Sequence, residues 1–190
     1  MSTMYNVDWP YEYSYRGYTP MYNVPPMYPG YQPYPYWGYN PMYNSYDPQR
    51  LIPLKDYGPA PFAVNIEEAS KQNTAFRRAL WTGKHLQVTL MSINVGGEIG
   101  LERHPNLDQF LRIEEGQGII KMGSKRDHLD FQQHVYDNFA IVIPAGKWHN
   151  LINTGHRPIK LYSIYAPPQH PHGTVHQTKA EADAAEKHHD

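Results

Sequence analysis

Side chains that can build a hydrophobic core are concentrated in the second part of this 190-residue chain. Residues 1–50 contain 13 of the 17 tyrosines and half of the 18 prolines, but no leucine, isoleucine or lysine. Proline lacks a backbone donor and interrupts both helices and sheet ladders, so this stretch cannot form a packed core. We therefore predict a disordered arm over residues 1–50, one folded domain over residues 51–176, and a tail with helical potential over residues 177–190.

The tyrosine- and proline-rich arm has two interpretations. It is either a disordered tail with incidental aromatic residues or an adhesive arm, because tyrosine rings stack and hydrogen-bond through the phenol. Its composition resembles that of the tails of bacterial spore-coat and other surface-layer proteins. That resemblance implies assembly into a protein shell, with the spore coat as the location.

Charge and composition argue against several kinds of partner and site. The formal net charge is −1 at pH 7, and no long run of Lys or Arg is present, so neither nucleic acid nor an anionic membrane is expected as a partner. The chain has no cysteine, which excludes disulfides and thiolate metal sites. No signal peptide or membrane-spanning apolar run is recognisable. We therefore expect a cytoplasmic protein in which any metal is bound by His, carboxylate or amide groups.

Alternating apolar and polar residues, separated by Gly, Pro and Asn, follow residue 51 and are typical of antiparallel strands. A helix is predicted over residues 66–72, with Asn65 as its N-cap, and a second, solvated helix over residues 179–187. So many short strands predict an all-β sandwich or small barrel. The predicted strands are 74–81, 85–95, 101–104, 109–113, 118–122, 139–143, 150–153 and 159–165.

Alternation along the strand predicted over residues 109–113 assigns Gln109 to the interior. Gln109, Leu111 and Ile113 share one face, and two of these three are aliphatic. The opposite face carries three charged residues, so it should face solvent. Gln109 is therefore a polar side chain that points into the predicted barrel.

The segment before that strand presents two residues of the kinds that bind metals. Glu102 and His104 share one face, and Arg103 lies on the other, so the carboxylate and the imidazole project in parallel. Residues 141–149 then form a buried strand and a Pro/Gly turn that ends at His149. This turn can bring His149 back beside His104.

The spacing of these residues resembles the first motif of the cupin superfamily. That motif is Gly, five residues, His-x-His, three or four residues, Glu, six residues, Gly. Gly96, His104 and Gly116 stand at the expected places, whereas Glu102 replaces the first His and Gln109 replaces the Glu. The first motif is therefore matched in spacing and altered in chemistry.

The second cupin motif is matched more closely. It reads Gly, five residues, Pro-x-Gly-x-x-His-x-x-x-Asn, and the chain supplies Pro144, Gly146, His149 and Asn153. The opening Gly is replaced by Asn138, and Asn is the residue best able to adopt the positive φ that such a turn demands. We therefore expect positive φ at Asn138.

The cupin resemblance implies an antiparallel double-stranded β-helix, the jelly-roll barrel of that superfamily. It also implies a homodimer, for which residues 51–64 are the candidate exchanged strand. The implied ligands of a divalent metal are Glu102, His104, Gln109 and His149. Two imidazoles and one carboxylate favour Fe(II) or Mn(II), with Zn or Ni as alternatives. A cupin that has lost its metal is the competing interpretation.

Three functions are compatible with such a barrel. The first is a metal-dependent enzyme acting on a small organic molecule, with dioxygenase-like oxidoreductase chemistry as the commonest match. The second is a sugar isomerase or epimerase, and the third is a non-catalytic scaffold that displays the arm in a spore coat. Catalytic residues are not assigned. An isomerase would also need a base, for which His85 or a tyrosine could serve. His128, His134 and His156 are expected on surface loops. The spacing of His170, His172 and His176 could suit a metal, but their proline-rich flanks favour an exposed loop.

Overall fold

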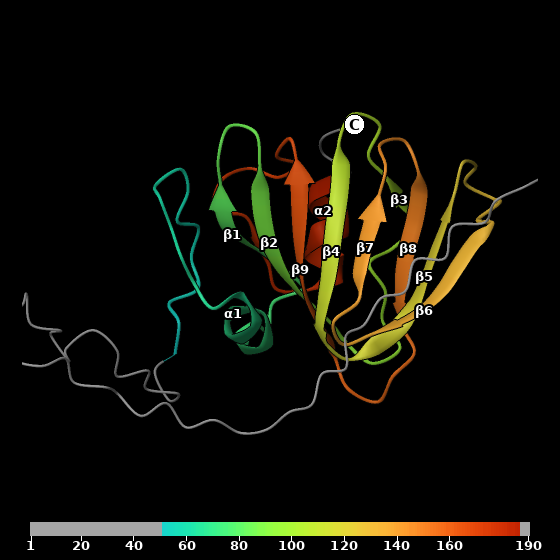
Figure 1. The fold of residues 1–190 in the computed structure, drawn as a ribbon, viewed down its shortest axis with the longest axis horizontal. Helices are drawn as coiled ribbons and strands as arrows, with labels where there is room; N and C mark the ends of the chain where they lie inside the picture. Colours follow the sequence, from blue (N-terminus) through green and yellow to red (C-terminus); the bar gives the residue numbers. More distant parts are fainter. Residues whose placement is uncertain (1–50, 187–190) are drawn as a thin grey trace, which may run out of the picture. The chain divides into compact units, whose positions relative to one another are not determined.

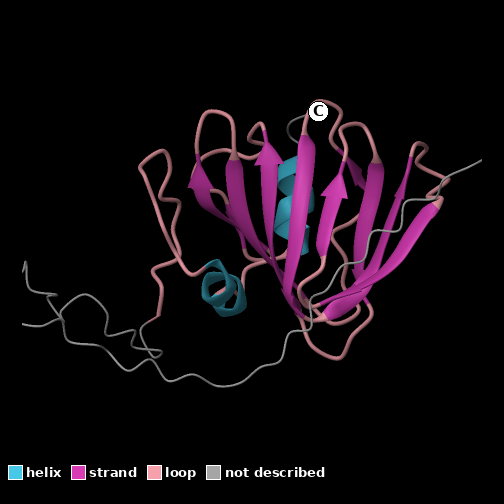
Figure 2. Ribbon diagram, viewed as in Figure 1, coloured by secondary structure: helices cyan, strands magenta, loops and turns pink. Residues whose placement is uncertain are grey.

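The computed structural model describes residues 51–186, which form two antiparallel sheets and two short helices (Figures 1 and 2). The all-β prediction is therefore confirmed, whereas the predicted arm over residues 1–50 lies outside the described residues. The elements are α1 (Ile66–Gln72), β1 (Arg77–Thr82), β2 (Gln87–Ile93), β3 (Glu102–Arg103), β4 (Asp108–Glu115), β5 (Gln117–Gly123), β6 (Phe131–Tyr136), β7 (Ala140–Ile143), β8 (Trp148–Asn153), β9 (Ile159–Ala166), β10 (Val175–His176) and α2 (Lys179–Glu186).

The strands form a six-stranded and a four-stranded sheet. The order of the larger sheet is β10-β1-β2-β9-β4-β7, and that of the smaller is β3-β8-β5-β6. β9 pairs with both β2 and β4, so the chain returns between strands formed much earlier in the sequence. This arrangement is the antiparallel double-stranded β-helix. It leaves β10 and β3 at sheet edges, and the two edges border the cavity described below.

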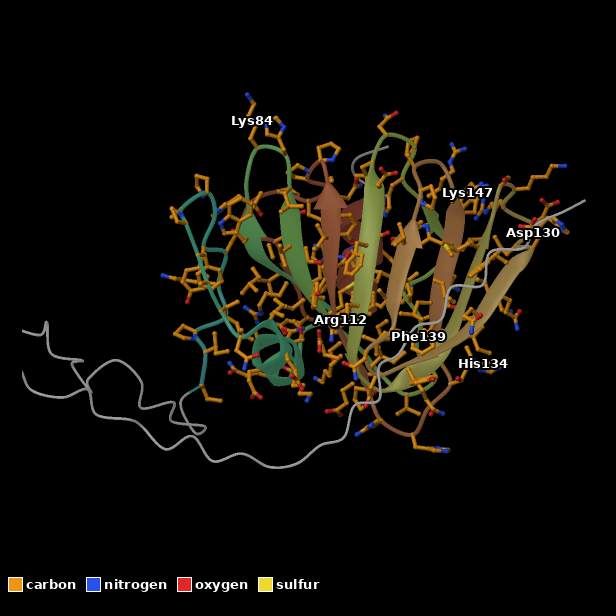
Figure 3. All side chains as sticks on the ribbon, in the orientation of Figure 1. Lys84, Arg112, Asp130, His134, Phe139 and Lys147 are labelled. Carbon is orange, nitrogen blue, oxygen red and sulfur yellow. The ribbon has the colours of Figure 1, made fainter. Side chains whose placement is uncertain are left out.

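Two hydrophobic clusters cover both faces of the larger sheet. β2 contributes to each, because Leu90 and Met91 point to opposite faces and both are fully buried. Side chains on the ribbon fill the space between the two sheets (Figure 3). That main cluster comprises Phe76, Met91, Ile93, Ile99, Leu111, Ile113, Ile120, Val135, Ile141, Ile143, Leu151, Ile159, Leu161 and Ala182.

Helix α1 begins and ends where the sequence predicts. The side chain of Asn65 accepts a hydrogen bond from Glu68 N at 3.2 Å, which caps the first turn. Ala69 is fully buried in the second cluster with Leu80 and Leu90. The helix therefore packs against the outer face of the larger sheet at β2, β4 and β9. Within residues 51–186, neither helix is long and apolar enough to cross a membrane.

Residues 51–64 form no strand within the described chain, and their exchange with a second copy stays a prediction. Tyr57 N donates to Leu80 O at 2.9 Å, and the rings of Tyr57 and Phe62 stack with centroids 4.1 Å apart. The apolar side chains of this segment pack on Leu80 and Leu90 of their own chain. Dimerisation itself stays a prediction.

Two strands and one buried contact differ from the sequence prediction. β6 was missed because only Val135 is buried in it; His134, which the sequence assigns to a loop, points outward from β6 (Figure 3). β10 was missed because it has only two residues. Helix α2 was expected to be solvated, but its Ala182 packs into the main cluster and is only 2% exposed.

Asp56 joins three separate parts of the chain. Its side chain is 2% exposed and accepts hydrogen bonds from Gly58 N at 3.0 Å, Thr82 Oγ1 at 2.6 Å and Gly173 N at 2.9 Å. Burial alone would raise the pKa of this carboxyl, but the three hydrogen bonds and nearby His172 outweigh burial and lower it. The ionised carboxylate therefore stabilises the fold.

Replacing Asp56 by alanine is expected to lower the free energy of unfolding by about 2–3 kcal/mol at pH 7, because three donors lose their acceptor. A lowered folded-state pKa contributes stability above the unfolded pKa of about 4, and that contribution is lost as the pH falls below it. Urea unfolding at pH 7 and pH 3 should show a smaller difference between parent and variant at pH 3. Asp130→Ala, at an exposed position of the chain (Figure 3), is the control; an equal effect at both positions would contradict the prediction.

Candidate metal centre

Strands β3 and β8 bring three of the predicted ligands together. Glu102 on β3 stands directly opposite His149 on β8 in the antiparallel register, and His104 follows β3. The ligand atoms of these three residues all lie within 4.8 Å of one another. The chain therefore contains a His/Glu cluster that could hold a metal ion.

The turn of the second motif positions His149. Gly146 has a φ of 78°, and its N–H donates to His104 O at 2.8 Å, so the turn is fastened to the segment that carries the other imidazole. Asn138, at the start of the motif, has a φ of 71°, as the sequence predicts. The residues that match the family motif thus serve the backbone geometry as well as the cluster.

The distances in the cluster suit a bound cation. Glu102 Oε1 lies 3.3 Å from His104 Nε2 and 3.2 Å from His149 Nε2. Two ligands about 2.1 Å from one ion, at tetrahedral or octahedral angles, would lie about 3.0–3.4 Å apart. The three side chains therefore fit a divalent metal with little rearrangement.

The hydrogen bond of the other ring nitrogen of His149 supports this fit. His149 is fully buried, and its Nδ1 lies 3.1 Å from Lys147 O, a group that can only accept a hydrogen bond. Nδ1 therefore carries a proton, and in the neutral ring the lone pair of Nε2 faces the carboxylate oxygen of Glu102. A cation between these two acceptors would satisfy both.

Arg77 completes the charge arrangement and was missed from the sequence. It is 1% exposed, and its Nη2 lies 3.8 Å from Glu102 Oε2, while Oε1 faces the two imidazoles. Burial alone would raise the pKa of Glu102, but in the metal-free protein, hydrogen bonds donated by imidazole N–H groups and the charge of Arg77 outweigh burial and hold it well below its usual range. A signal was present, because Arg77 and Arg78 are consecutive on a strand and must point to opposite faces.

Gln109 points inward, in agreement with the alternation. It is 2% exposed, and its Nε2 donates to Ser163 Oγ at 3.1 Å. Its Oε1 is buried and has no hydrogen-bond partner among the described residues. In the sheet Gln109 stands opposite Tyr165, whose ring is edge-on to His104 with centroids 5.7 Å apart. The oxygen is thus an unpaired hydrogen-bond acceptor near the cluster, and its ligation of a metal stays a prediction.

A cavity of about 650 Å³ reaches the cluster. Residues 101–104, including Glu102 and His104, contribute to its lining. The other lining residues come from the C-terminal part of the domain, namely Gln169, His170, Pro171, Thr174, His176 and Ala185. The C-terminal segment therefore forms one wall of the cavity.

The expected exposed loop is only partly confirmed. His172 is exposed and lies 3.0 Å from Gly58 O, but His170 is partly buried and lines the cavity. His176, in β10, also lines the cavity and stands opposite Arg77 of β1.

Similarity to known proteins agrees with this geometry. Residues 89–165 match the family model of the cupin domain. The uncharacterized protein YrkC of Bacillus subtilis (strain 168) is 69% identical over 142 residues, which are 75% of this chain and 76% of that protein. The chain belongs to the cupin superfamily.

Two further relatives share much of this cupin. The uncharacterized protein L612 of Acanthamoeba polyphaga mimivirus is 40% identical over 116 residues, or 60% of this cupin and 70% of that protein. BH2720 from Bacillus halodurans, whose crystal structure is known, is 70% identical in sequence, and its structure superposes on this one with a TM-score of 0.68. That match covers 68% of this cupin and 98% of the BH2720 chain.

Proposed function

We propose that this cupin binds one divalent metal ion through Glu102, His104 and His149 and acts on a small organic molecule as a dioxygenase-like oxidoreductase. The main support is the approach of Glu102 Oε1 to both Nε2 atoms, at 3.3 and 3.2 Å, beside a cavity of about 650 Å³. Two imidazoles and one carboxylate favour Fe(II) or Mn(II), with Zn(II) or Ni(II) as alternatives. Gln109 Oε1 is the proposed weak fourth ligand.

The side chains around the proposed metal have separate roles. A bound ion would supply Lewis-acid chemistry and, if it is Fe(II) or Mn(II), redox chemistry. Glu102 anchors it and lowers its net charge, while Arg77 engages Oε2 and leaves Oε1 toward the imidazoles. The Lys147 carbonyl fixes the ring of His149. The cavity beside Glu102 and His104 gives a small molecule access to the open coordination positions.

A sugar isomerase or epimerase is the second candidate, because it would use the same metal as a Lewis acid and also needs a group that handles a proton. The cavity wall contributes a further imidazole, His170, which could serve such a reaction. A scaffold role in a protein shell remains the non-catalytic alternative. A scaffold would not use the cavity for a reaction and would not need a metal.

Metal analysis tests these functions. The full chain, purified anaerobically without an affinity tag, is expected to contain about one Fe or Mn per chain by plasma mass spectrometry. Oxygen consumption is then screened with small hydroxy acids, catechols and sugars. Bound Zn or Ni without oxygen consumption would favour the isomerase. A chain that stays metal-free after dialysis against Fe(II), Mn(II), Zn(II) and Ni(II) would refute the metal site and favour the scaffold.

A further inference from the structure

The backbone of His170 is held by the buried side chain of a residue that lies 83 positions earlier in the sequence. Gln87, fully buried on β2, accepts hydrogen bonds through Oε1 from His170 N at 2.9 Å and Gln169 N at 3.3 Å. Its Nε2 donates to His170 O at 2.8 Å. One amide therefore binds both backbone groups of His170 and fixes where its side chain begins.

The ring of His170 forms part of the cavity wall that faces Glu102 and His104. It packs edge-on against Tyr165 with centroids 5.1 Å apart, and Tyr165 in turn is edge-on to His104. Nε2 of His170 is buried and has no hydrogen-bond partner within the described part of the chain. Buried polar atoms are almost always paired in folded proteins, so an unpaired nitrogen in a cavity wall indicates a ligand that pairs with it.

The charge state of His170 defines what it can bind. Burial, assisted by the positive charge of Arg77, lowers the pKa of His170 to about 3. Near pH 7 the ring is therefore neutral, and in the tautomer that carries its proton on Nδ1 the buried Nε2 accepts a hydrogen bond. A hydroxyl group of a ligand is the natural donor to such an atom.

The charges around the cavity indicate an anionic ligand. Glu102 is the carboxylate among its described lining residues, and Arg103 adds a positive charge to the lining. Arg77 lies behind Glu102, at 3.8 Å. With a divalent ion on Glu102, positive charges would outnumber negative ones, so a carboxylate would bind best.

We propose that His170 is a further binding residue of this site, whose imidazole accepts a hydrogen bond from the hydroxyl group of a small hydroxy acid bound beside Glu102 and His104. This assignment rests on the proposed metal-dependent function. It adds a residue from the C-terminal segment, outside both cupin motifs, and it specifies the class of ligand. The hydroxyl group provides the specificity, and the carboxylate provides the charge.

The test uses the full chain loaded with Mn(II) and two probes that differ by one hydroxyl group. Calorimetric titration measures the affinities for glycolate and acetate, and their ratio is the hydroxyl preference. His170→Phe should reduce this preference roughly tenfold, because it removes the acceptor while keeping a ring in the wall. His170→Gln, which keeps an acceptor, should retain part of it. His172→Phe, on the exposed side of the same segment, should match the parent.

Each other outcome is decisive as well. An unchanged hydroxyl preference in a folded His170→Phe protein overturns the proposal, as does a parent that binds Mn(II) but neither probe. Loss of Mn(II) from His170→Phe would mean that the ring acts as a ligand instead. If His170→Phe does not fold, a parent-like preference in His170→Leu, or no difference between His170→Gln and His170→Leu at equal melting temperatures, overturns it. A parent that takes up no metal refutes the proposed function separately.

Discussion

The His149→Ala variant is expected to bind divalent metal at least about 100-fold more weakly than the parent chain. The substitution removes one of the three clustered ligand groups, and changes even to groups that only orient metal ligands commonly cost 10–100-fold in affinity. It also removes the imidazole of β8 that lies next to Glu102 of β3. Competition with a chelator, followed by mass spectrometry of the protein fraction, measures the change.

His134→Ala is the matched control for His149→Ala, because His134 projects from the exposed face of β6 (Figure 3). This variant should bind metal like the parent. If His149→Ala also retained parent-like affinity, the cluster of Glu102, His104 and His149 would not be the metal site.

Arg77→Met should destabilise the metal-free protein by about 3–5 kcal/mol, because it leaves the buried carboxylate of Glu102 without its guanidinium partner. The metal-bound protein should lose much less, since the ion would compensate the same carboxylate. Consequently the variant should bind Mn(II) more tightly than the parent, because Arg77 repels the cation. Urea unfolding with excess chelator and with Mn(II) measures both effects.

Arg78→Met is the control for Arg77→Met. Arg78 points to the other face of β1, where it donates to Leu54 O at 3.1 Å, so its replacement should cost about 1 kcal/mol with and without metal. Equal stabilisation by Mn(II) in the parent and in Arg77→Met would contradict the proposed competition between Arg77 and the ion.

The local pattern of the sequence was sufficient for the elements that depend on near neighbours. Helix α1 has its own cap at Asn65 and its own acidic first turn, so its bounds were predictable. The inward direction of Gln109 followed from alternation, since a strand buries one face. The family motifs fixed the turn that returns His149 to Glu102.

Features that depend on distant residues were not predictable in this way. His170 follows prolines and reads as part of an exposed loop, and its burial depends on Gln87, 83 residues earlier. β6 is almost wholly exposed and owes its place to pairing with β5, so periodicity could not identify it. Arg77 reads as a surface charge until Glu102 is placed beside it.

The hydrogen bonds of Asp56 bear on how short a functional version of this chain can be. Thr82 Oγ1 donates to Asp56 and accepts from Gln87 Nε2 at 2.9 Å, and the same amide holds His170. A truncated chain that starts at residue 65 would keep both motifs and every clustered ligand. It would lack Asp56, however, which begins this series of hydrogen bonds. A truncated version that keeps this series of hydrogen bonds must therefore begin upstream of the first helix.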